Sequence, residues 1–187
     1  NIINNEEEVK KAILHELKRG GQVYYLFNDL KKIEEKAYTI KSMLPEARVE
    51  IAHGQMDSSK VEKTLDAFYE GEIDILVCST IIENGSDIPN VNTIIIDGAE
   101  RFGLSQLYQL KGRVGRSKLR GYCYLLIRNF NLLSTIAKKR LKIIQQMAEL
   151  GSGFKIASYD LQLRGAGEML GAEQSGHISS IGYELYI

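Results

Sequence analysis

Five short apolar runs, separated by stretches with helical spacing, constrain the fold of this 187-residue chain more than any other feature. The runs are rich in β-branched and aromatic residues, and they are too continuous for strands with one solvated face. They cover residues 23–27, 49–52, 73–78, 93–96 and 122–127. We therefore predict an α/β fold in which buried, mostly parallel strands are joined by right-handed crossovers.

The stretches between these runs place apolar residues three or four positions apart, as amphipathic helices do. An opening helix through residues 9–17 should end at Gly20 and Gly21. After residue 127 a helical pattern continues to residue 148, glycines interrupt it, and a second apolar stripe begins at Phe154. We predict two domains: an α/β domain at residues 1–128, and a helical hairpin with a C-terminal loop at residues 129–187.

The net charge of zero hides a strong asymmetry along the chain. Residues 1–100 carry 11 Lys or Arg and 19 Asp or Glu, residues 101–142 carry 11 and none, and residues 143–187 carry 2 and 5. Solvated faces normally mix both signs, so the acid-free segment indicates a polyanionic partner, either a nucleotide or a nucleic acid. Chance clustering is the alternative.

The composition also disfavours several classes of protein. No apolar run approaches the roughly 20 residues of a membrane span, and no secretory signal is visible, so we expect a soluble, cytoplasmic protein without a membrane partner. Cys78 and Cys123 lie inside apolar runs, which favours buried thiols over a disulfide or a metal site.

Residues 109–116 form the most distinctive polar motif. Gly112 and Gly115 allow a tight turn, and Arg113 and Arg116 can then project toward one point. Guanidinium groups pair bidentately with phosphate oxygens, so a phosphate chain is the expected ligand. A basic surface loop is the alternative.

Other polar segments follow predicted strands, where ligands bind in open α/β sheets. His53 and Gly54 follow the second strand, and residues 79–90 follow the third. In that second segment, the Thr80 hydroxyl can bond a phosphate, Gly85 permits close approach, and Asp87 can accept from a ribose hydroxyl or an arginine. An ordinary strand-to-helix turn is the alternative.

The order and spacing of these motifs resemble a known family. Residues 25–28, 53–56, 79–89 and 109–116 resemble motifs IV, IVa, V and VI of the second RecA-like domain of superfamily 2 helicases. The tail is similar to the translocation motif shared by the RecG branch-migration helicases and the bacterial transcription-repair coupling factors, through residues 150–154, 160–168 and 173–176. Residues 21–28 and 53–56 resemble the transcription-repair coupling factors more than the RecG helicases. The resemblance implies a three-layer RecA-like fold.

The resemblance also implies roles for matching residues. Arg113 and Arg116 would reach the β and γ phosphates of ATP, Arg116 as arginine finger, and Gln109 would orient their loop. The residues implied to line the nucleotide are Glu83, Gly85, Asp87 and Gly112. The implied nucleic-acid contacts are Asn28, His53, Gly54 and Thr80. The implied coupling residues of the hairpin are Arg140, Arg164 and Gln174.

Two departures from the family pattern are Lys111, where arginine is common, and Ser86, where an apolar residue is usual. Neither is one of the implied phosphate ligands. For the two hairpin arginines, ordinary surface ion pairs are the alternative role.

The sequence contains no G-x-x-x-x-G-K-[ST] loop and no acidic magnesium-binding motif, since residues 97–100 lack its pattern. The chain therefore carries half of an ATPase site, with Mg²⁺ held by a missing partner lobe, and we predict that it hydrolyses ATP negligibly alone. The implied partners are double-stranded DNA and an N-terminal RecA-like lobe of the same protein. RNA polymerase and excision-repair proteins would bind through other domains.

Three functions are consistent with these observations. The chain could be the motor lobe of a double-stranded DNA translocase acting in transcription-coupled repair, or the equivalent lobe of a RecG-type helicase. The third possibility is a RecA-like module that binds nucleic acid or protein without hydrolysis. Both arginines of the phosphate motif are present, which disfavours this third possibility.

Overall fold

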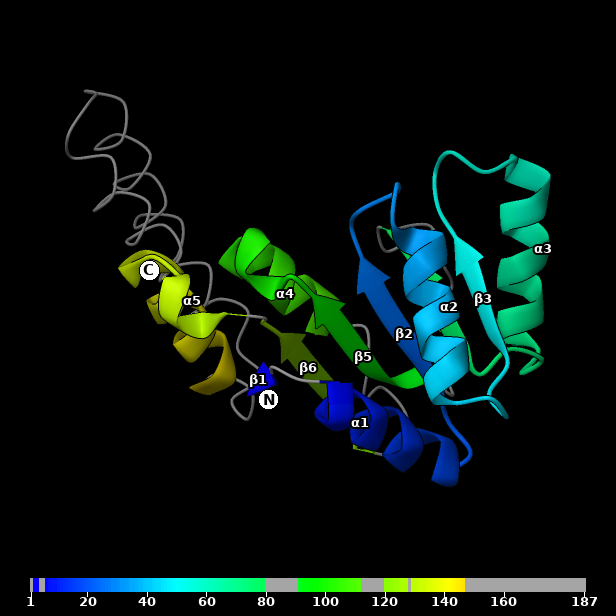
Figure 1. Cartoon of the computed structure of the whole chain (residues 1–187), viewed down its shortest axis with the longest axis horizontal. Coiled ribbons are helices and arrows are strands. Elements are labelled where there is room, and N and C mark those ends of the chain that lie inside the picture. The colour runs from blue at the N-terminus through cyan, green and yellow to red at the C-terminus, as the bar shows by residue number, and fades with distance from the viewer. Residues whose placement is uncertain (1, 4–5, 80–90, 112–119, 128, 147–187) are drawn as a thin grey trace, which may run out of the picture. The chain divides into compact units, whose positions relative to one another are not determined.

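The computed structural model describes residues 2–3, 6–79, 91–111, 120–127 and 129–146 (Figure 1). The chain divides into two compact units. The first unit comprises Asn1–Ala99 and Leu110–Arg128, and the second comprises Glu100–Gln109 and Asn129–Ile187.

A six-stranded sheet forms the centre of the first unit, in the order β1-β6-β5-β2-β4-β3, and its described strands pair in parallel. The strands are β1 (Ile2–Ile3), β2 (Gln22–Phe27), β3 (Val49–Ala52), β4 (Ile75–Cys78), β5 (Val91–Asp97) and β6 (Tyr122–Leu126). Every residue of β4 and β5 is buried. This confirms the prediction of an α/β fold with strands covered on both faces.

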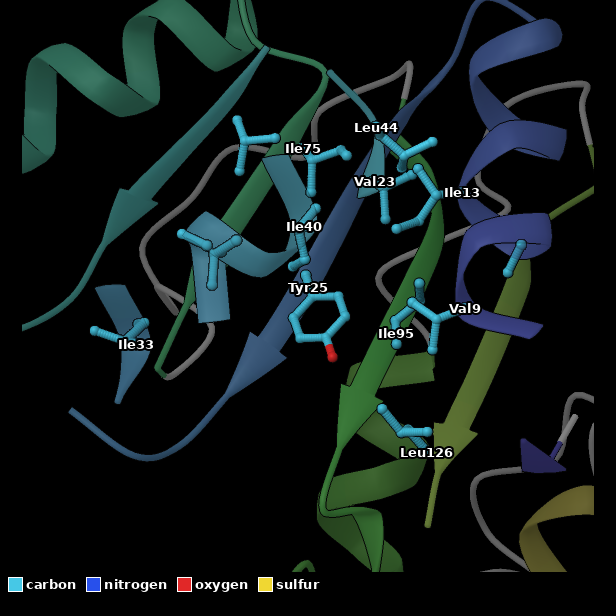
Figure 2. Close-up of a cluster of buried hydrophobic side chains, with 14 residues drawn as sticks. Val9, Ile13, Val23, Tyr25, Ile33, Ile40, Leu44, Ile75, Ile95 and Leu126 are labelled. Atoms are coloured by element: carbon cyan, nitrogen blue, oxygen red, sulfur yellow. The ribbon is translucent and has the colours of Figure 1, made fainter. Parts of the chain in front are cut away.

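In the described part of the first unit, three helices cover this sheet: α1 (Glu6–Lys18), α2 (Ile33–Met43) and α3 (Ser58–Tyr69). Residues of α1 and α2 share one apolar cluster with Tyr25 and Ile95, as Figure 2 shows, whereas Phe68 of α3 packs with Leu76 in another. Side chains alternate between the faces of a strand, so these clusters lie on opposite faces. The connection from β2 to β3 passes over β4 toward the edge of the sheet, and the connection from β3 to β4 runs in the opposite direction. Because both crossovers are right-handed, α2 and α3 must cover opposite faces of the sheet.

Some element bounds differ from the predicted ones. β4 begins at Ile75 rather than Ile73, because the N–H groups of Asp74 and Ile75 both bond the carbonyl of Arg48. The strand β1 was not predicted, since two residues are too few to show a period. The opening helix ends at Lys18, and Gly20 follows with φ 78°, the left-handed conformation that favours glycine after a helix.

The described part of the second unit is helical. Its regular elements are α4 (Leu104–Lys111), η2 (Phe130–Leu132) and α5 (Thr135–Gln146), and η1 (Ala99–Arg101) precedes α4. Leu104 and Leu107 of α4 and Leu141 and Ile144 of α5 are buried. The helix α5 is the first helix predicted for the hairpin, and the second lies outside the described residues.

The helix α4 corrects one prediction. The glycines of residues 109–116 predict a tightly turning loop, but residues 109–111 form the last turn of α4. The buried leucines Leu104 and Leu107 recur at helical spacing and hold this segment in a helix. Gln109 is therefore a helical residue.

Candidate nucleotide and nucleic-acid site

The carboxyl ends of four strands in the first unit lie level with one another. Phe27 of β2 pairs with Asp97 of β5, and Cys78 of β4 pairs with both Leu26 and Ala52. The residues that follow these strands therefore leave the sheet at a single edge. In an open α/β sheet this edge is where ligands bind.

Asn28 is the first residue after β2, and its side chain is exposed. A short turn follows it. The Asp29 carboxylate accepts a hydrogen bond from the Lys31 N–H at 3.1 Å, and the Asp29 carbonyl accepts one from the Lys32 N–H at 3.1 Å. This arrangement is an Asx-type turn, which fixes the backbone just before α2 begins at Ile33.

His53 and Gly54 follow β3 in a second turn at the same edge. The His53 carbonyl accepts a hydrogen bond from the Met56 N–H at 3.1 Å, and its Nδ1 accepts one from the Gln55 N–H at 3.2 Å. A neutral imidazole that accepts at Nδ1 carries its proton on Nε2. The ring can therefore donate to a phosphate oxygen from Nε2.

Replacing Gly54 with alanine tests whether a phosphate backbone approaches this turn. Gly54 is exposed, its φ is not positive, and a Cβ added to it would meet no atom within 4 Å. We expect the variant to gain about 0.4–1 kcal/mol in stability, because alanine restricts the unfolded chain. If a phosphate lies against the glycine, DNA affinity should fall about five-fold, the effect of one lost hydrogen bond. Thermal melts and DNA titrations of the full-length protein measure the two effects.

Gly71→Ala provides the contrasting control. Gly71 has φ 79°, so an alanine there would be strained by about 1–2 kcal/mol and should lower the melting temperature. Its DNA affinity should not change, because Gly71 precedes β4 at the opposite edge of the sheet. Unchanged DNA affinity in Gly54→Ala would contradict a close approach at this turn.

Cys78 is the last residue of β4, and Ser79 begins the next segment of the candidate site. Burial raises the pKa of the Cys78 thiol to about 12, so this group stays protonated and is not a nucleophile at neutral pH. Ser79 is also buried. Both cysteines are free thiols. The predicted burial is confirmed for Cys78, but Cys123 is half-buried, because β6 is covered less completely than β4.

Two predicted residues lie in the described part of the second unit. Gln109 is exposed on α4. Arg140 is half-buried on α5, and its Nη1 donates a long hydrogen bond of 3.4 Å to the carbonyl of Phe102. Its Nε is buried without a hydrogen bond among the described residues, and the same holds for Oε2 of Glu100. Arg140 therefore ties α5 to the segment just before α4.

The remaining predicted site residues lie outside the described part of the chain. They are Thr80, Glu83, Gly85, Asp87, Gly112, Arg113, Arg116, Arg164 and Gln174. Within the described ranges, no group of three His, Cys, Asp or Glu side chains is arranged to hold a metal ion. No helix in those same ranges is long and apolar enough to cross a membrane.

Sequence reasoning missed two acidic residues. Asp97, the last residue of β5, is buried at the carboxyl edge of the sheet, where its side chain contacts Tyr25 and Lys36. Glu100 carries the orphaned oxygen described above and is the only carboxylate in the described part of the second unit. From the sequence, residues 97–100 were compared only with the acidic magnesium-binding motif, and they lack its pattern. The carboxylate that ends an otherwise apolar strand run was the available signal for Asp97.

The family model of the helicase conserved C-terminal domain matches residues 5–118. The chain therefore belongs to this family.

Among curated proteins, the chain is similar to transcription-repair-coupling factors. It is 53% identical to that of Bacillus subtilis over 178 residues and 50% identical to that of Escherichia coli over 179 residues. These matches cover 95% and 96% of this chain but 15% and 16% of the relatives. The chain thus spans less than a fifth of the length of these two relatives.

Solved helicase structures share the fold. A RecG structure bound to a three-way DNA junction matches with a TM-score of 0.72 and 32% identity, covering 89% of this chain and 22% of that one. The C-terminal domain of the DEAD-box protein Dbp5 matches with a TM-score of 0.56 and 19% identity, over 79% of this chain and 83% of that one. The second match supports the fold alone. The predicted RecA-like helicase fold is confirmed.

Proposed function

We propose that this chain is the second RecA-like lobe of an ATP-dependent double-stranded DNA translocase that acts in transcription-coupled repair and displaces stalled RNA polymerase. The observation that carries the proposal is that about half of the aligned residues are identical to those of transcription-repair-coupling factors along nearly the whole chain. These matches cover 95% and 96% of the chain, so they extend beyond the family domain into the tail, where the sequence resembles a translocation motif.

In this function the lobe supplies arginines to an ATP site completed by a first lobe of the same protein. Arg113 and Arg116 gain contacts with the β and γ phosphates when the two lobes close, and Gln109 orients their loop. Glu83, Gly85, Asp87 and Gly112 line the nucleotide. ATP then favours the closed pair through this difference in contacts, and hydrolysis removes the preference.

The nucleic-acid side of the lobe uses the turns at the carboxyl edge of the sheet. Asn28, His53 and Gly54 leave the sheet there, and Thr80 follows β4 in the sequence. Contacts of this kind to phosphates are independent of base sequence and weaken with salt. Arg140, Arg164 and Gln174 then relay closure to movement along the duplex.

Mg²⁺ is held by the first lobe in this proposal, because the chain carries no acidic motif for it. RNA polymerase and excision-repair proteins bind through other domains of the longer protein. We expect the full-length protein to work in the cytoplasm.

The half-site proposal predicts that the isolated chain hydrolyses ATP at least about 10³-fold more slowly than the full-length protein on double-stranded DNA, since lysine, metal and water-positioning groups are missing. Steady-state phosphate release with Mg²⁺ measures both rates, and a cooperative thermal melt checks that the isolated chain is folded. Brisk turnover by the folded chain alone would rule out the half-site. Failure of the full-length protein to displace a stalled RNA polymerase would rule out the coupling function.

A RecG-type branch-migration lobe is the second candidate, because the RecG structure matches 89% of the chain. The two functions differ in their preferred DNA. A coupling factor should be stimulated equally by linear duplex and by three-way junctions, whereas a branch-migration enzyme should be stimulated far more by junctions. ATPase assays with both substrates distinguish them.

A further inference from the structure

A buried carboxylate lies at the point where the connections of the sheet reverse direction. The strands β2 and β5 are neighbours, but the chain leaves β2 through α2 toward β3 and leaves β5 toward β6 on the other side. Asp97 ends β5 at this position, beside Phe27 at the end of β2. Its exposure is 6%. Ligands of open α/β sheets bind next to such a switch point.

Two groups from different elements converge on one oxygen of this carboxylate. The Tyr25 hydroxyl of β2 donates a hydrogen bond of 2.8 Å to Asp97 Oδ2, and Lys36 Nζ of α2 lies 3.2 Å from the same oxygen. The Lys36 ammonium also lies 5.0 Å from the centre of the Phe27 ring. We call Tyr25, Phe27, Lys36 and Asp97 the switch-point cluster.

The surroundings of the cluster are apolar. Tyr25 belongs to the apolar cluster that contains Ile33 and Ile95, and Figure 2 shows its ring among these side chains with the hydroxyl toward the arrowheads of β2 and β5. A buried ion pair contributes little net stability compared with apolar side chains of similar volume. The hydrogen bond and the ion pair instead fix positions: they hold the ends of β2 and β5 and the first turn of α2 in place relative to one another.

Residues of the cluster lie on both sides of the turn that carries Asn28. Phe27 immediately precedes this turn, and Lys36 lies in the first turn of α2, which follows it. Asp97 therefore holds both ends of the turn to the sheet. On the far side, Gly98 follows Asp97 with φ 74° and donates its N–H to the carbonyl of Leu126 at 3.0 Å, so the backbone that carries the carboxylate is held by β6.

We propose that Lys36, Tyr25 and Asp97 are positioning residues that hold the Asn28 turn in the conformation that contacts the DNA backbone. This inference rests on the proposed function, which supplies the DNA. The cluster acts on DNA binding and leaves the chemical step unaffected, because it lies around the Asn28 turn and contributes no phosphate ligand to ATP.

The test uses the full-length protein with Lys36→Met, Tyr25→Phe and Lys36→Arg. Methionine keeps the packing over Phe27 and removes the charge, phenylalanine removes only the hydroxyl, and arginine restores a cation. ATP hydrolysis is measured against the concentration of double-stranded DNA, together with the melting temperature. We expect Lys36→Met to raise the half-saturating DNA concentration about five-fold with an unchanged maximal rate, Tyr25→Phe to act in the same direction, and Lys36→Arg to recover most of the loss.

Arg48→Met is the matched control. It breaks the ion pair between Arg48 and Asp74, whose charged atoms lie 2.9 Å apart. This pair lies at the amino ends of β3 and β4, and the Arg48 side chain is exposed. Its DNA response should equal that of the wild type. A Lys36→Met variant that behaves like this control would overturn the inference, and so would a fall in maximal rate and melting temperature at constant half-saturation.

Tyr25→Phe separates positioning from direct contact. Tyr25 is 2% exposed and cannot itself touch DNA. If Lys36→Met weakens DNA binding and Tyr25→Phe does not, Lys36 is a direct phosphate ligand and the positioning role is wrong. If the wild type shows no DNA-stimulated hydrolysis, the proposed function fails, and direct DNA titrations of the same variants still decide the role of the cluster.

Discussion

Replacing Arg116 with alanine in the full-length protein is expected to lower DNA-stimulated ATP hydrolysis by about 10³- to 10⁵-fold, the range in which an arginine finger contributes to phosphoryl transfer. The charge on the transferring phosphoryl group develops in the transition state, and a guanidinium fork stabilises it there more than in the ground state. ATP affinity should therefore change much less than the maximal rate. DNA binding without nucleotide should remain largely intact. Phosphate-release kinetics and DNA titrations measure these quantities.

Two further variants make this result specific. Arg116→Lys keeps the charge but loses the bidentate fork, so it should recover only a small part of the rate. Arg120→Ala removes the next arginine along the chain, whose guanidinium lies 5.6 Å from the ring centre of Tyr122 at the start of β6. This variant should hydrolyse ATP normally. A normal rate in Arg116→Ala would remove the arginine finger from the mechanism. If Arg120→Ala lost a similar part of the ATP hydrolysis rate, the effect would come from the total positive charge of this segment rather than from Arg116 in particular.

The sheet could be predicted from the sequence because its strands are short continuous apolar runs. Ile94, Ile95 and Ile96 are all fully buried, and such a run fits only a strand that is covered on both faces. The placement of His53 and Ser79 at one edge followed from the parallel order of the strands, whereas Asn28 was assigned only through the resemblance to motif IV. The level pairing of Phe27 with Asp97 and of Ala52 with Cys78 confirms that placement.

The switch-point cluster could not be predicted in the same way. Lys36 lies on a helix among acidic neighbours, where a lysine usually faces solvent, and Asp97 is 61 positions further along the chain. Only the adjacency of β2 and β5 brings the two together, and a single sequence does not specify which strands are neighbours. The helix α4 had a visible signal in Leu104 and Leu107, but the glycines and arginines that follow it indicated a loop for the whole motif.

Arg140→Met in the full-length protein is expected to uncouple movement from hydrolysis. In the described part of the second unit, Arg140 links α5 to the Phe102 carbonyl, and its buried Nε requires an acceptor that methionine would not require. The variant should therefore fold, hydrolyse ATP at a near-normal DNA-stimulated rate, and move along the duplex about ten-fold more slowly, within the range of about 0.5–2 kcal/mol found for coupling residues. Displacement of a DNA-bound triplex strand measures movement in parallel with phosphate release.

Lys139→Met is the control for Arg140→Met, because Lys139 is the exposed neighbour on the same helix and makes the same change in charge. It should move and hydrolyse like the wild type. Equal losses of movement and hydrolysis in Arg140→Met would place the residue in the hydrolysis step, and normal movement would exclude it from the relay. A selective loss of movement would instead assign the link between α5 and the Phe102 carbonyl to the transmission of lobe closure, because among the described residues that hydrogen bond is lost when the arginine side chain is replaced.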